Sequence, residues 1–476
     1  MLLLRRPETA LFALVFGVYA YFYQAGGWNQ NSRFDLTRAI VERGTIAIDA
    51  YQENTGDKAE REGHWYSDKA PGLSWLLVPP YAVAYLVRPG AVAAGAYVST
   101  VVALALPSAL AVVLMFRLGL HLGLSAAWSA AITCAYALAT LALPYSTILY
   151  GHQLQAALGF AAFALLTMAR APAAAGALLG AAVCVDYTAG LLVVIVAAYA
   201  AHRLGPRAVL RLAMGGAIPA VALGAYHAAA FGHPLALPYD FVLQEHRRMG
   251  WFMGIGAPVP AVVGELLWGA HRGLFYSSPW LLAGVPGLLA LARRGHRAEA
   301  AVAVAVFAAY LLMNAGLVDW EGGWAMGPRY LIPAIPFLAM GAMGLVLALP
   351  APPHPARRTL AVAGGALAAI SLGLMLVGTA VRPEVPLSEE RPYQDYLFPL
   401  LARGRVARSN HAIDSPGGTG ERQAWNLGHG LGLDGVATLV PLAFWMAAAG
   451  AWLARSVRDP RGPSPNVSEP PSTPLP

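Results

Sequence analysis

Residues 25–72 concentrate charged side chains in a chain that is otherwise poor in them. The segment holds both lysines of the chain, Lys58 and Lys69, and eight of its 25 acidic residues. The eight are Asp35, Glu42, Asp49, Glu53, Asp57, Glu60, Glu62 and Asp68. A carboxylate can serve as a general base toward a hydroxyl group or bind a divalent cation, and a lysine can pair with a phosphate. Together these groups suit a reaction whose leaving group is a lipid-linked phosphate.

The end of this segment sets Lys69 at the edge of an apolar stretch. The chain there reads Tyr66-Ser67-Asp68-Lys69-Ala70-Pro71-Gly72. It runs directly into the apolar residues 73–88. Pro71 and Gly72 favour a turn, and we expect this turn to hold Lys69 at the depth of the lipid headgroups.

The first half of the segment, from Asn29 to Ala47, has the spacing of a helix lying at the membrane interface. Its apolar residues are Phe34, Leu36, Ile40 and Val41, and its charged residues are Arg33, Asp35, Arg38, Glu42 and Arg43. Such a helix sets Asp35 close to the bilayer surface. Four acidic residues further along are expected to be solvated loop residues, namely Glu53, Asp57, Glu60 and Glu62.

Polar side chains also stand where two later apolar stretches begin. His152 and Gln153 begin one of them. Arg329 begins the other, on the side of the membrane where positive charge is disfavoured. A phosphate or carboxylate partner explains such an arginine, and an ion pair with Asp319 or Glu321 is the alternative.

Two further residues have two interpretations each. Tyr330 follows Arg329 and is either a contact of the same ligand or an aromatic residue of the membrane interface. Asp186 lies inside the apolar stretch 171–202. An ionisable group within the membrane is a functional-site candidate by default, but Asp186 only caps a turn if this stretch is a hairpin.

The composition shows what must position these residues. Of the 476 residues, 57% are hydrophobic and 12% are charged, and the mean hydropathy is +0.53. A soluble domain has roughly twice that share of charged residues, so a soluble enzyme, a coiled coil and a disordered protein are excluded. The net charge of +7 comes mostly from arginines at the ends of apolar stretches and does not indicate nucleic-acid binding. Cys134 and Cys184 both lie in apolar stretches, so we expect no disulfide or cysteine metal site.

The apolar stretches predict an all-α polytopic membrane protein with about 12 transmembrane helices, since one span needs about 20 apolar residues. The expected spans are 8–24, 73–88, 92–116, 126–143, 150–169, 207–231, 274–292, 298–317, 329–349, 358–381 and 433–454. The stretch 171–202 is either one tilted span or two short helices broken near Asp186. The abundant glycines are expected to serve close helix packing.

Arginine positions orient these spans, because cytoplasmic loops carry an excess of positive charge. They predict cytoplasmic termini, a transmembrane domain over 1–455 and a site on the periplasmic or extracellular side. The expected external loops are 25–72, 232–273, 318–328 and 382–432. Two topologies remain possible for residues 73–202. In the first, 171–202 is a hairpin and one segment among 73–143 does not cross the membrane. In the second, 171–202 is one span and two arginines lie on the external side. The Pro- and Ser-rich tail 456–476 is expected to be disordered, and its sequon at Asn466 to be chance.

The order of these motifs resembles the GT-C superfamily of integral-membrane glycosyltransferases. The resemblance is to the branch with protein O-mannosyltransferases and lipid A aminoarabinose transferases. It rests on the apolar anchor, on Arg33-Phe34-Asp35, on the closing Tyr66–Gly72 motif and on Gly323-Trp324-Ala325-Met326-Gly327-Pro328-Arg329-Tyr330-Leu331. It implies a bacterial inner-membrane enzyme that moves a sugar from a polyprenyl-phosphate donor to an acceptor hydroxyl of a lipid, glycan or protein, with inversion.

The resemblance also implies roles for individual residues. Asp35 matches the catalytic acid of the first external loop and would be the general base, with Asp68, Asp240 and Asp319 as alternatives. Lys69 matches the lysine that contacts the carrier phosphate, although Ala70 stands where the family often has a proline. The side chains expected to contact substrate are Arg33, Asp68, Lys69, His152, Gln153, Arg329 and Tyr330. Asp35 is followed by Leu36-Thr37, so the paired acids of metal-dependent members are missing, and a divalent cation is possible but not required.

Two other functions compete with a glycosyltransferase. A transporter or lipid flippase tends to have repeated halves and ionisable residues at the membrane midplane. The sequence contains no repeat of fixed period and only Asp186 as a midplane candidate. A structural subunit without chemistry does not explain why Asp35 and Lys69 accompany a long charged loop.

Overall fold

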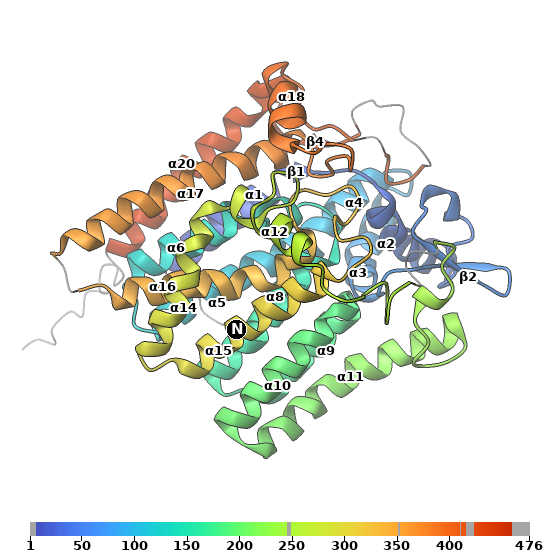
Figure 1. Ribbon diagram of the computed structural model, residues 1–476. Helices are drawn as coiled ribbons and strands as arrows, with labels where there is room; N and C mark the ends of the chain where they lie inside the picture. Colours follow the sequence, from blue (N-terminus) through green and yellow to red (C-terminus); the bar gives the residue numbers. More distant parts are fainter. Residues whose placement is uncertain (1–5, 245–248, 351–352, 410, 416–422, 459–476) are drawn as a thin grey trace, which may run out of the picture.

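The computed structural model describes residues 6–244, 249–350, 353–409, 411–415 and 423–458. Figure 1 shows a bundle of helices with little strand structure. The predicted disordered tail lies outside the described residues except for 456–458, which are helical and end the last helix. The sequon at Asn466 also lies outside them.

Within the described residues, eight helices are long and apolar enough to cross a membrane. They are α4–η3–α5 (Val92–Thr100, Val101–Ala105, Leu106–His121), α8 (Gly151–Ala169), η4–α10 (Tyr187–Ala189, Gly190–Leu204), α11 (Pro206–Phe231), α15 (Arg297–Ala315), η8–α16 (Arg329–Ala334, Ile335–Ala348), α17 (Pro355–Val381) and η10–α20 (Gly435–Leu439, Val440–Arg458). Four shorter apolar helices are α3 (Gly72–Val87), α6 (Ala126–Leu138), α9 (Pro172–Val185) and η7–α14 (Pro279–Ala283, Gly284–Arg293). The predicted all-α polytopic fold is therefore confirmed.

The remaining elements are one further helix of the bundle, α1, and short elements at the helix ends and in the connecting loops. The helices are α1 (Arg6–Tyr19), α2 (Trp28–Arg38), η1 (Ala39–Arg43), η2 (Gln52–Asn54), α7 (Ala142–Tyr145), η5 (Pro238–Asp240), α12 (Pro260–Trp268), α13 (Leu274–Ser277), η9 (Pro392–Leu397), α18 (Phe398–Ala402) and α19 (Leu427–Gly430). The strands form two antiparallel pairs, β1 (Phe22–Tyr23) with β4 (Trp425–Asn426) and β2 (Lys58–Arg61) with β3 (His64–Ser67). The tight β2–β3 turn uses two residues with positive φ, Glu62 and Gly63, as two-residue hairpin turns require.

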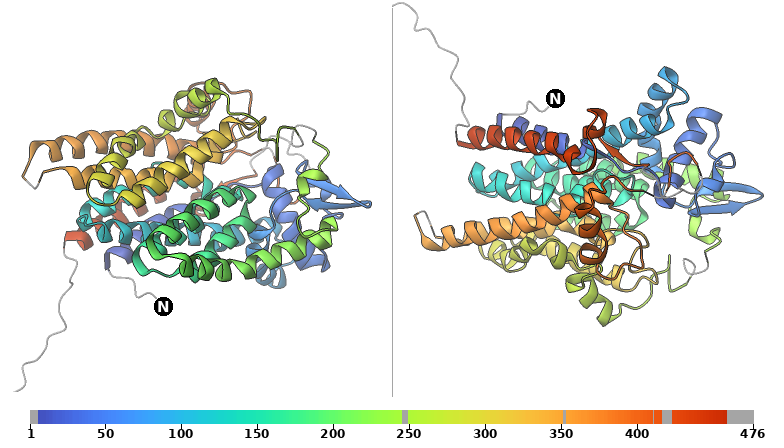
Figure 2. Two further views of the ribbon diagram at one scale, coloured as in Figure 1. Left: turned by 60° about the horizontal axis from the view of Figure 1, so that its bottom comes forward. Right: turned by 90° about the horizontal axis from the view of Figure 1, so that it is seen from above.

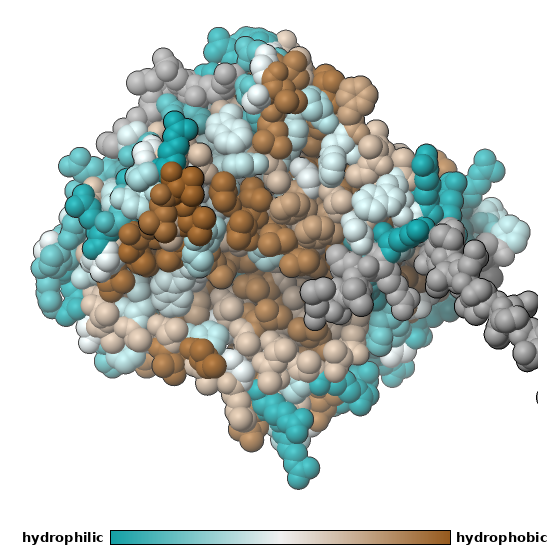
Figure 3. Space-filling model, turned by 180° about the vertical axis from the view of Figure 1, so that it is seen from behind, coloured by the Kyte–Doolittle hydropathy of each residue, from teal (hydrophilic) through white to brown (hydrophobic). Residues whose placement is uncertain are grey.

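The surface of the bundle matches a membrane environment. Figure 3 shows brown and tan apolar surface between hydrophilic regions. In the most apolar stretch of α11 and of α17, only 11% of the residues are buried inside the protein. These helices thus turn apolar side chains outward, which is favourable in lipid and costly in water.

The stretch 171–202 forms a hairpin of two helices. A Cβ added at Gly176 would overlap the carbonyl of Leu212, and the Cys184 thiol donates to the Pro219 carbonyl at 3.4 Å. Helices α9 and α11 therefore lie side by side and run in the same direction. Helix α10, which connects them, must run the opposite way, so a single tilted span is wrong. The contact at Gly176 is also the close helix packing expected of the glycines.

Helix α3 is the segment that does not cross the bundle. The ion pair Glu8–Arg117, at 2.7 Å, sets the end of α5 beside the start of α1. The Tyr97 hydroxyl donates to the Ala20 carbonyl at 2.7 Å and sets the start of α4 beside the end of α1. Helix α3 begins against Cys184, at the same end of the bundle at which α4 begins. Both ends of α3 thus lie at one end, which we call the loop end.

The loop end carries the β2–β3 hairpin, and Figure 2 shows the start of α1 and the end of α20 at the opposite end. Two distant segments cover α2 there. Strand β1 pairs with β4, and Asn54 Nδ2 donates to the Ile413 carbonyl at 2.9 Å. The expected interfacial helix is confirmed as a helix, but its polar face is buried under these segments instead of facing water. Arg33, for example, is only 3% exposed.

Single-cysteine labelling tests the position of α3. Gly90, in the exposed turn after α3, is expected to react as Gly90→Cys with a membrane-impermeant maleimide from the same side as Glu60→Cys on β2. Arg294→Cys, after α14, is expected to react only from the other side. Labelling of intact spheroplasts and of inverted vesicles measures this, with the wild type as the control because its cysteines lie within α6 and α9. Labelling of Gly90→Cys together with Arg294→Cys would show that α3 crosses.

Candidate functional site

Arg33 ties three elements together at the loop end. It projects from α2, and its Nη1 donates to the carbonyls of Ala70 and Val185, each at 3.3 Å. Its Nε donates to Asn29 Oδ1 at 3.2 Å, one helical turn earlier. Burial lowers the pKa of Arg33, and the nearby carboxylates, Asp186 first among them, oppose this shift. One side chain thereby joins α2 to the β3–α3 turn and to the end of α9.

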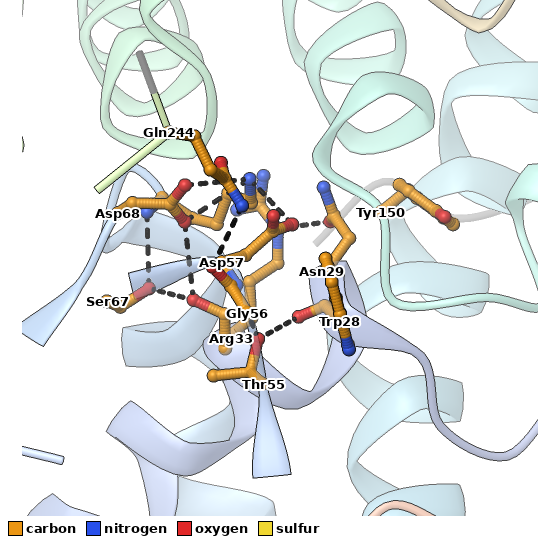
Figure 4. A network of polar contacts seen from close by, with 12 residues as sticks. Trp28, Asn29, Arg33, Thr55, Gly56, Asp57, Ser67, Asp68, Tyr150 and Gln244 are labelled. Carbon is orange, nitrogen blue, oxygen red and sulfur yellow. Dashed lines mark hydrogen bonds and ion pairs between the residues drawn. The ribbon is translucent and has the colours of Figure 1, made fainter. Parts of the chain in front are cut away.

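Lys69 lies between two buried carboxylates. Its Nζ is 2.9 Å from Asp57 Oδ2 and 3.2 Å from Asp68 Oδ1, and no side chain of the three is more than 8% exposed. Figure 4 shows Asp57 and Asp68 turned toward the same space beside Arg33. Asp68 is held from α2, because Ser32 Oγ donates to it at 3.5 Å. Such a group persists only when each charge keeps a partner, since the desolvation of an unpaired ion costs several kcal/mol.

Asp186 caps the hairpin turn and also lines a cavity. Its Oδ1 accepts from the Thr188 amide at 3.0 Å, so it caps the start of η4 in the hairpin turn. Its other oxygen lies 3.5 Å from His152 Nδ1, at the beginning of α8. Asp186 and His152 face one cavity, so the cap is also part of a site at the loop end and not at the middle of the bundle.

Arg329 is buried and forms no ion pair with a carboxylate among the described residues. The guanidinium carbon lies 4.9 Å from the centres of the Tyr150 and Tyr330 rings, and Nη2 donates to the Tyr330 hydroxyl at 3.0 Å. Its Nε has no partner among the described residues. The structure describes Asp319 and Glu321 as well and contains no ion pair between either of them and Arg329. The alternative of an ion pair is therefore wrong.

These side chains line two adjoining cavities. A small one of about 90 Å³, which we call the cationic chamber, is lined by Arg33, Lys69, His152, Asp186, Arg329 and Tyr330 among others. A larger one of about 460 Å³, the acidic chamber, is lined by Trp28, Asp57, Tyr150, Trp324, Glu384 and His411 among others. Asn29, Asp319 and Arg329 line both. Only the acidic chamber has the size typical of a small-molecule pocket.

An apolar groove of about 900 Å³ lies between α9 and α11 and reaches the cationic chamber. Its wall includes Leu179, Val183, Ala220 and Ala228. Tyr187 and Met253 line both the groove and the cationic chamber. The groove, the cationic chamber and the acidic chamber thus adjoin in this order.

Three predicted site residues, Asp35, Asp68 and Gln153, line none of these cavities. Asp35 is fully buried and accepts from Asn54 Nδ2 at 3.1 Å, and its Oδ2 has no hydrogen-bond partner in the part of the chain that the structure describes. Burial raises the pKa of Asp35 well above its usual value. Gln153 donates to the Tyr136 hydroxyl at 3.4 Å within the bundle. The prediction that Asp35 is the base remains a prediction, and its contacts give it no direct path to a ligand in either chamber.

Two buried carboxylates of the acidic chamber, Asp57 and Glu384, are not marked by any local pattern in the sequence. Asp57 was expected to be solvated, but it is 5% exposed, because Lys69 and the loop around Thr55 enclose it. Glu53, Glu60 and Glu62 are exposed as expected. Glu384 accepts from the Tyr150 hydroxyl at 3.2 Å, and burial raises its pKa to about 7. It stands in a long loop that has no motif, so no local signal marked it.

The described residues do not fit a metal site. Among them, no group of three or more His, Cys, Asp or Glu side chains is placed to hold an ion. Asp57 and Asp68, the two carboxylates beside Lys69, both pair with this lysine.

No protein-family model and no curated protein sequence matches this chain. Among solved structures, the fold is similar to that of ArnT from Cupriavidus metallidurans bound to undecaprenyl phosphate. The TM-score is 0.48 and the sequence identity is 18%, over 94% of this chain and 76% of that chain.

The raised pKa of Glu384 predicts a pH-dependent stability. A carboxyl whose pKa is higher in the folded than in the unfolded state favours folding below its unfolded value of 4.5, and this contribution is lost as pH rises through about 7. Glu384→Gln mimics the protonated form beside Tyr150, Arg382 and Arg329. The difference in Tm between Glu384→Gln and the wild type is therefore expected to shift in favour of the variant by about 3–6 °C when the pH is raised from 5 to 8.

Thermal unfolding in detergent, followed at both pH values, measures this difference. Glu390→Gln, at an exposed site in the same loop, is the matched control and is expected to show a constant difference. A constant difference for Glu384→Gln as well would mean that the buried carboxyl titrates near its ordinary value.

Proposed function

We propose that this protein is a membrane glycosyltransferase that moves a sugar from a polyprenyl-phosphate donor to an acceptor hydroxyl at the loop end, with inversion. One observation carries the proposal. Three buried cations, Arg33, Lys69 and Arg329, line a small chamber that lies between an apolar groove and a larger chamber with carboxylates and tryptophans. A lipid tail, a phosphate and a sugar, joined in this order, match these three compartments.

The groove between α9 and α11 suits the polyprenyl chain. Its lining is almost entirely apolar, and helix α11 turns apolar side chains toward the lipid. A chain that enters from the bilayer can therefore reach Tyr187 without exposing itself to water. Burial of each CH₂ group contributes about 0.8 kcal/mol. The tail therefore supplies binding affinity, and the cationic chamber fixes the position of the phosphate.

The cationic chamber suits the phosphate. Among the described residues, Arg329 forms no ion pair, and its Nε has no hydrogen-bond partner. Arg33 and Lys69 keep their protein partners, so they add charge to the same space at fixed positions. Donors that are held in place before reaction stabilise the negative charge that develops on a leaving phosphate, because they need no reorganisation. The site therefore favours departure of the carrier phosphate.

The acidic chamber suits the sugar and the acceptor. Trp28 and Trp324 expose 53% and 38% of their surfaces, which leaves ring faces available to an apolar sugar face. A general base must come within hydrogen-bond reach of the hydroxyl that it deprotonates. Asp57, Asp319 and Glu384 on the chamber wall meet this condition better than the enclosed Asp35, which would have to move.

The expected orientation remains part of the proposal. Arginines gather between spans at the end of the bundle opposite the site, for example Arg203 and Arg294. By the positive-inside rule this end is cytoplasmic, and the loop end is periplasmic in a bacterial inner membrane. Asp186 was the only midplane residue in favour of a transporter, and its position at the loop end removes that support.

Substitution of the chamber cations tests the function. Proteoliposomes would be given a panel of radiolabelled polyprenyl-phosphate sugars, with envelope extract as the acceptor. Lys69→Gln and Arg329→Gln are each expected to lower transfer at least 100-fold, because loss of one preorganised donor costs about 10²–10³ in rate. Arg203→Gln, exposed at the opposite end, is the matched control. Unchanged transfer by both chamber variants would contradict the assignment of the phosphate site.

A bulky residue in the groove tests the lipid path. Ala220→Trp fills part of the groove and is expected to raise KM for an undecaprenyl-phosphate donor about tenfold or more, while a donor with a two-isoprene tail is affected less. Ala217→Trp, exposed on α11 but outside the groove lining, is the matched control. Equal effects of the two variants would mean that the tail binds elsewhere.

A further inference from the structure

The Lys69–Asp57 ion pair stands in the wall between the two chambers. Lys69 lines the cationic chamber and Asp57 lines the acidic chamber. The nitrogen and oxygen are 2.9 Å apart, and both side chains are 8% exposed. A ligand phosphate in the cationic chamber therefore meets a cation whose charge is already shared with a carboxylate of the neighbouring chamber.

Asp57 has a backbone that is fixed independently of this ion pair. Its amide donates to Thr55 Oγ1 at 3.0 Å, and Thr55 Oγ1 donates to the Trp28 carbonyl at 2.7 Å. Gln244 Nε2 donates to the carbonyl of the preceding Gly56 at 3.0 Å. The carboxylate can thus turn about its side-chain bonds without moving the loop.

Lys69 does not need Asp57 to remain neutralised. Its second carboxylate, Asp68, lies 3.2 Å away, is fully buried and is held by Ser32. When a phosphate approaches Lys69, the lysine keeps Asp68 and exchanges Asp57 for the phosphate. Exchange of Asp68 for the phosphate, with Asp57 kept, is less favourable. Asp68 lines neither chamber, so it could not turn toward a ligand in one of them.

We propose that Asp57 is the general base of the transfer and that donor binding switches it on by taking Lys69 from it. The proposal rests on the proposed function. Before donor binds, the ion pair holds the Asp57 carboxylate and weakens it as a base toward a hydroxyl. Donor phosphate in the cationic chamber competes for Lys69, and Asp57 turns into the acidic chamber, where the acceptor hydroxyl binds.

The transfer step balances with these groups alone. The acceptor hydroxyl gives its proton to Asp57 as its oxygen forms a bond to the anomeric carbon. The bond from that carbon to the phosphate oxygen breaks, and its electron pair stays on the phosphate, which Lys69, Arg33 and Arg329 stabilise. Protonated Asp57 then releases its proton to water. Because phosphate binding is needed to free the base, a water molecule is not activated while the site is empty.

The other chamber carboxylates lack this link. Glu384 accepts from Tyr150, and Asp319 belongs to the loop that carries Trp324. Within the described residues, neither forms an ion pair with a cation of the cationic chamber. Only Asp57 couples a phosphate contact to a base in the next chamber.

Asp57→Asn separates binding from catalysis. The variant is expected to lose at least 1000-fold in transfer and to bind undecaprenyl phosphate about tenfold more tightly than the wild type, because a neutral amide competes less for Lys69. Binding would be followed by tryptophan fluorescence of the detergent-solubilised full chain. Glu60→Gln, exposed on β2, is the matched control and is expected to change neither quantity. A purely structural residue would weaken binding together with transfer.

Asp57→Ala provides a second readout that does not depend on the amide. Added formate is expected to restore part of its transfer, because a small carboxylate can occupy the vacated space and accept the proton. Asp35→Asn and Asp35→Ala, run in parallel, are expected to show no tighter binding and no formate rescue, respectively. Each variant is first checked for monodisperse elution.

The outcomes distinguish this proposal from the one on which it rests. Transfer by Asp57→Asn at the wild-type rate, or weaker binding of undecaprenyl phosphate to it, overturns the role of Asp57. Loss of transfer in Asp35→Asn with formate rescue of Asp35→Ala assigns the base to Asp35 instead. A wild type that binds no undecaprenyl phosphate and transfers no sugar overturns the proposed function itself.

Discussion

The buried group formed by Lys69, Asp57 and Asp68 is the interaction on which the loop end depends. One cation pairs with two carboxylates there, and both carboxylates are taken out of water. Removal of one partner from such a group typically costs 3–5 kcal/mol, because the remaining charge stays buried. The group also joins the loop before β2 to the turn before α3, so the walls of both chambers depend on it.

Helix packing sets where this group lies relative to the bundle. Gly176 and Gly215 let α9 and α11 approach until each backbone touches the other. The parallel arrangement brings the end of α9 to Gly72 and to the carbonyl contact of Arg33. The membrane helices thus deliver Asp186, and with it His152, to the same place at which the charged loop delivers Lys69.

The order of the compartments follows from the solvent that each one faces. The groove lies among helices whose apolar faces are turned to lipid, the cations lie where the bundle ends, and the acidic chamber lies beyond them among loops. A substrate with an apolar tail, an anionic link and a polar head can satisfy all three at once. The apolar, cationic and acidic compartments therefore follow one another from the membrane helices to the loops, and the Lys69–Asp57 pair connects the cationic chamber to the acidic chamber.

The sequence by itself determined the membrane class, the all-α fold and the segments that hold Arg33, Lys69, His152 and Arg329. It could do so because apolar length, arginine placement and turn residues are local signals that a lipid environment enforces. Only the tertiary structure decided that 171–202 is a hairpin, that α3 stays at the loop end and that Asp57 and Glu384 are buried while Asp35 is closed off. Burial of those carboxylates is set by contacts across hundreds of residues, such as that of Asn54 with Ile413. A charged loop residue looks the same in sequence whether water or another segment covers it, so the spacing of residues could not distinguish Asp57 from its solvated neighbours.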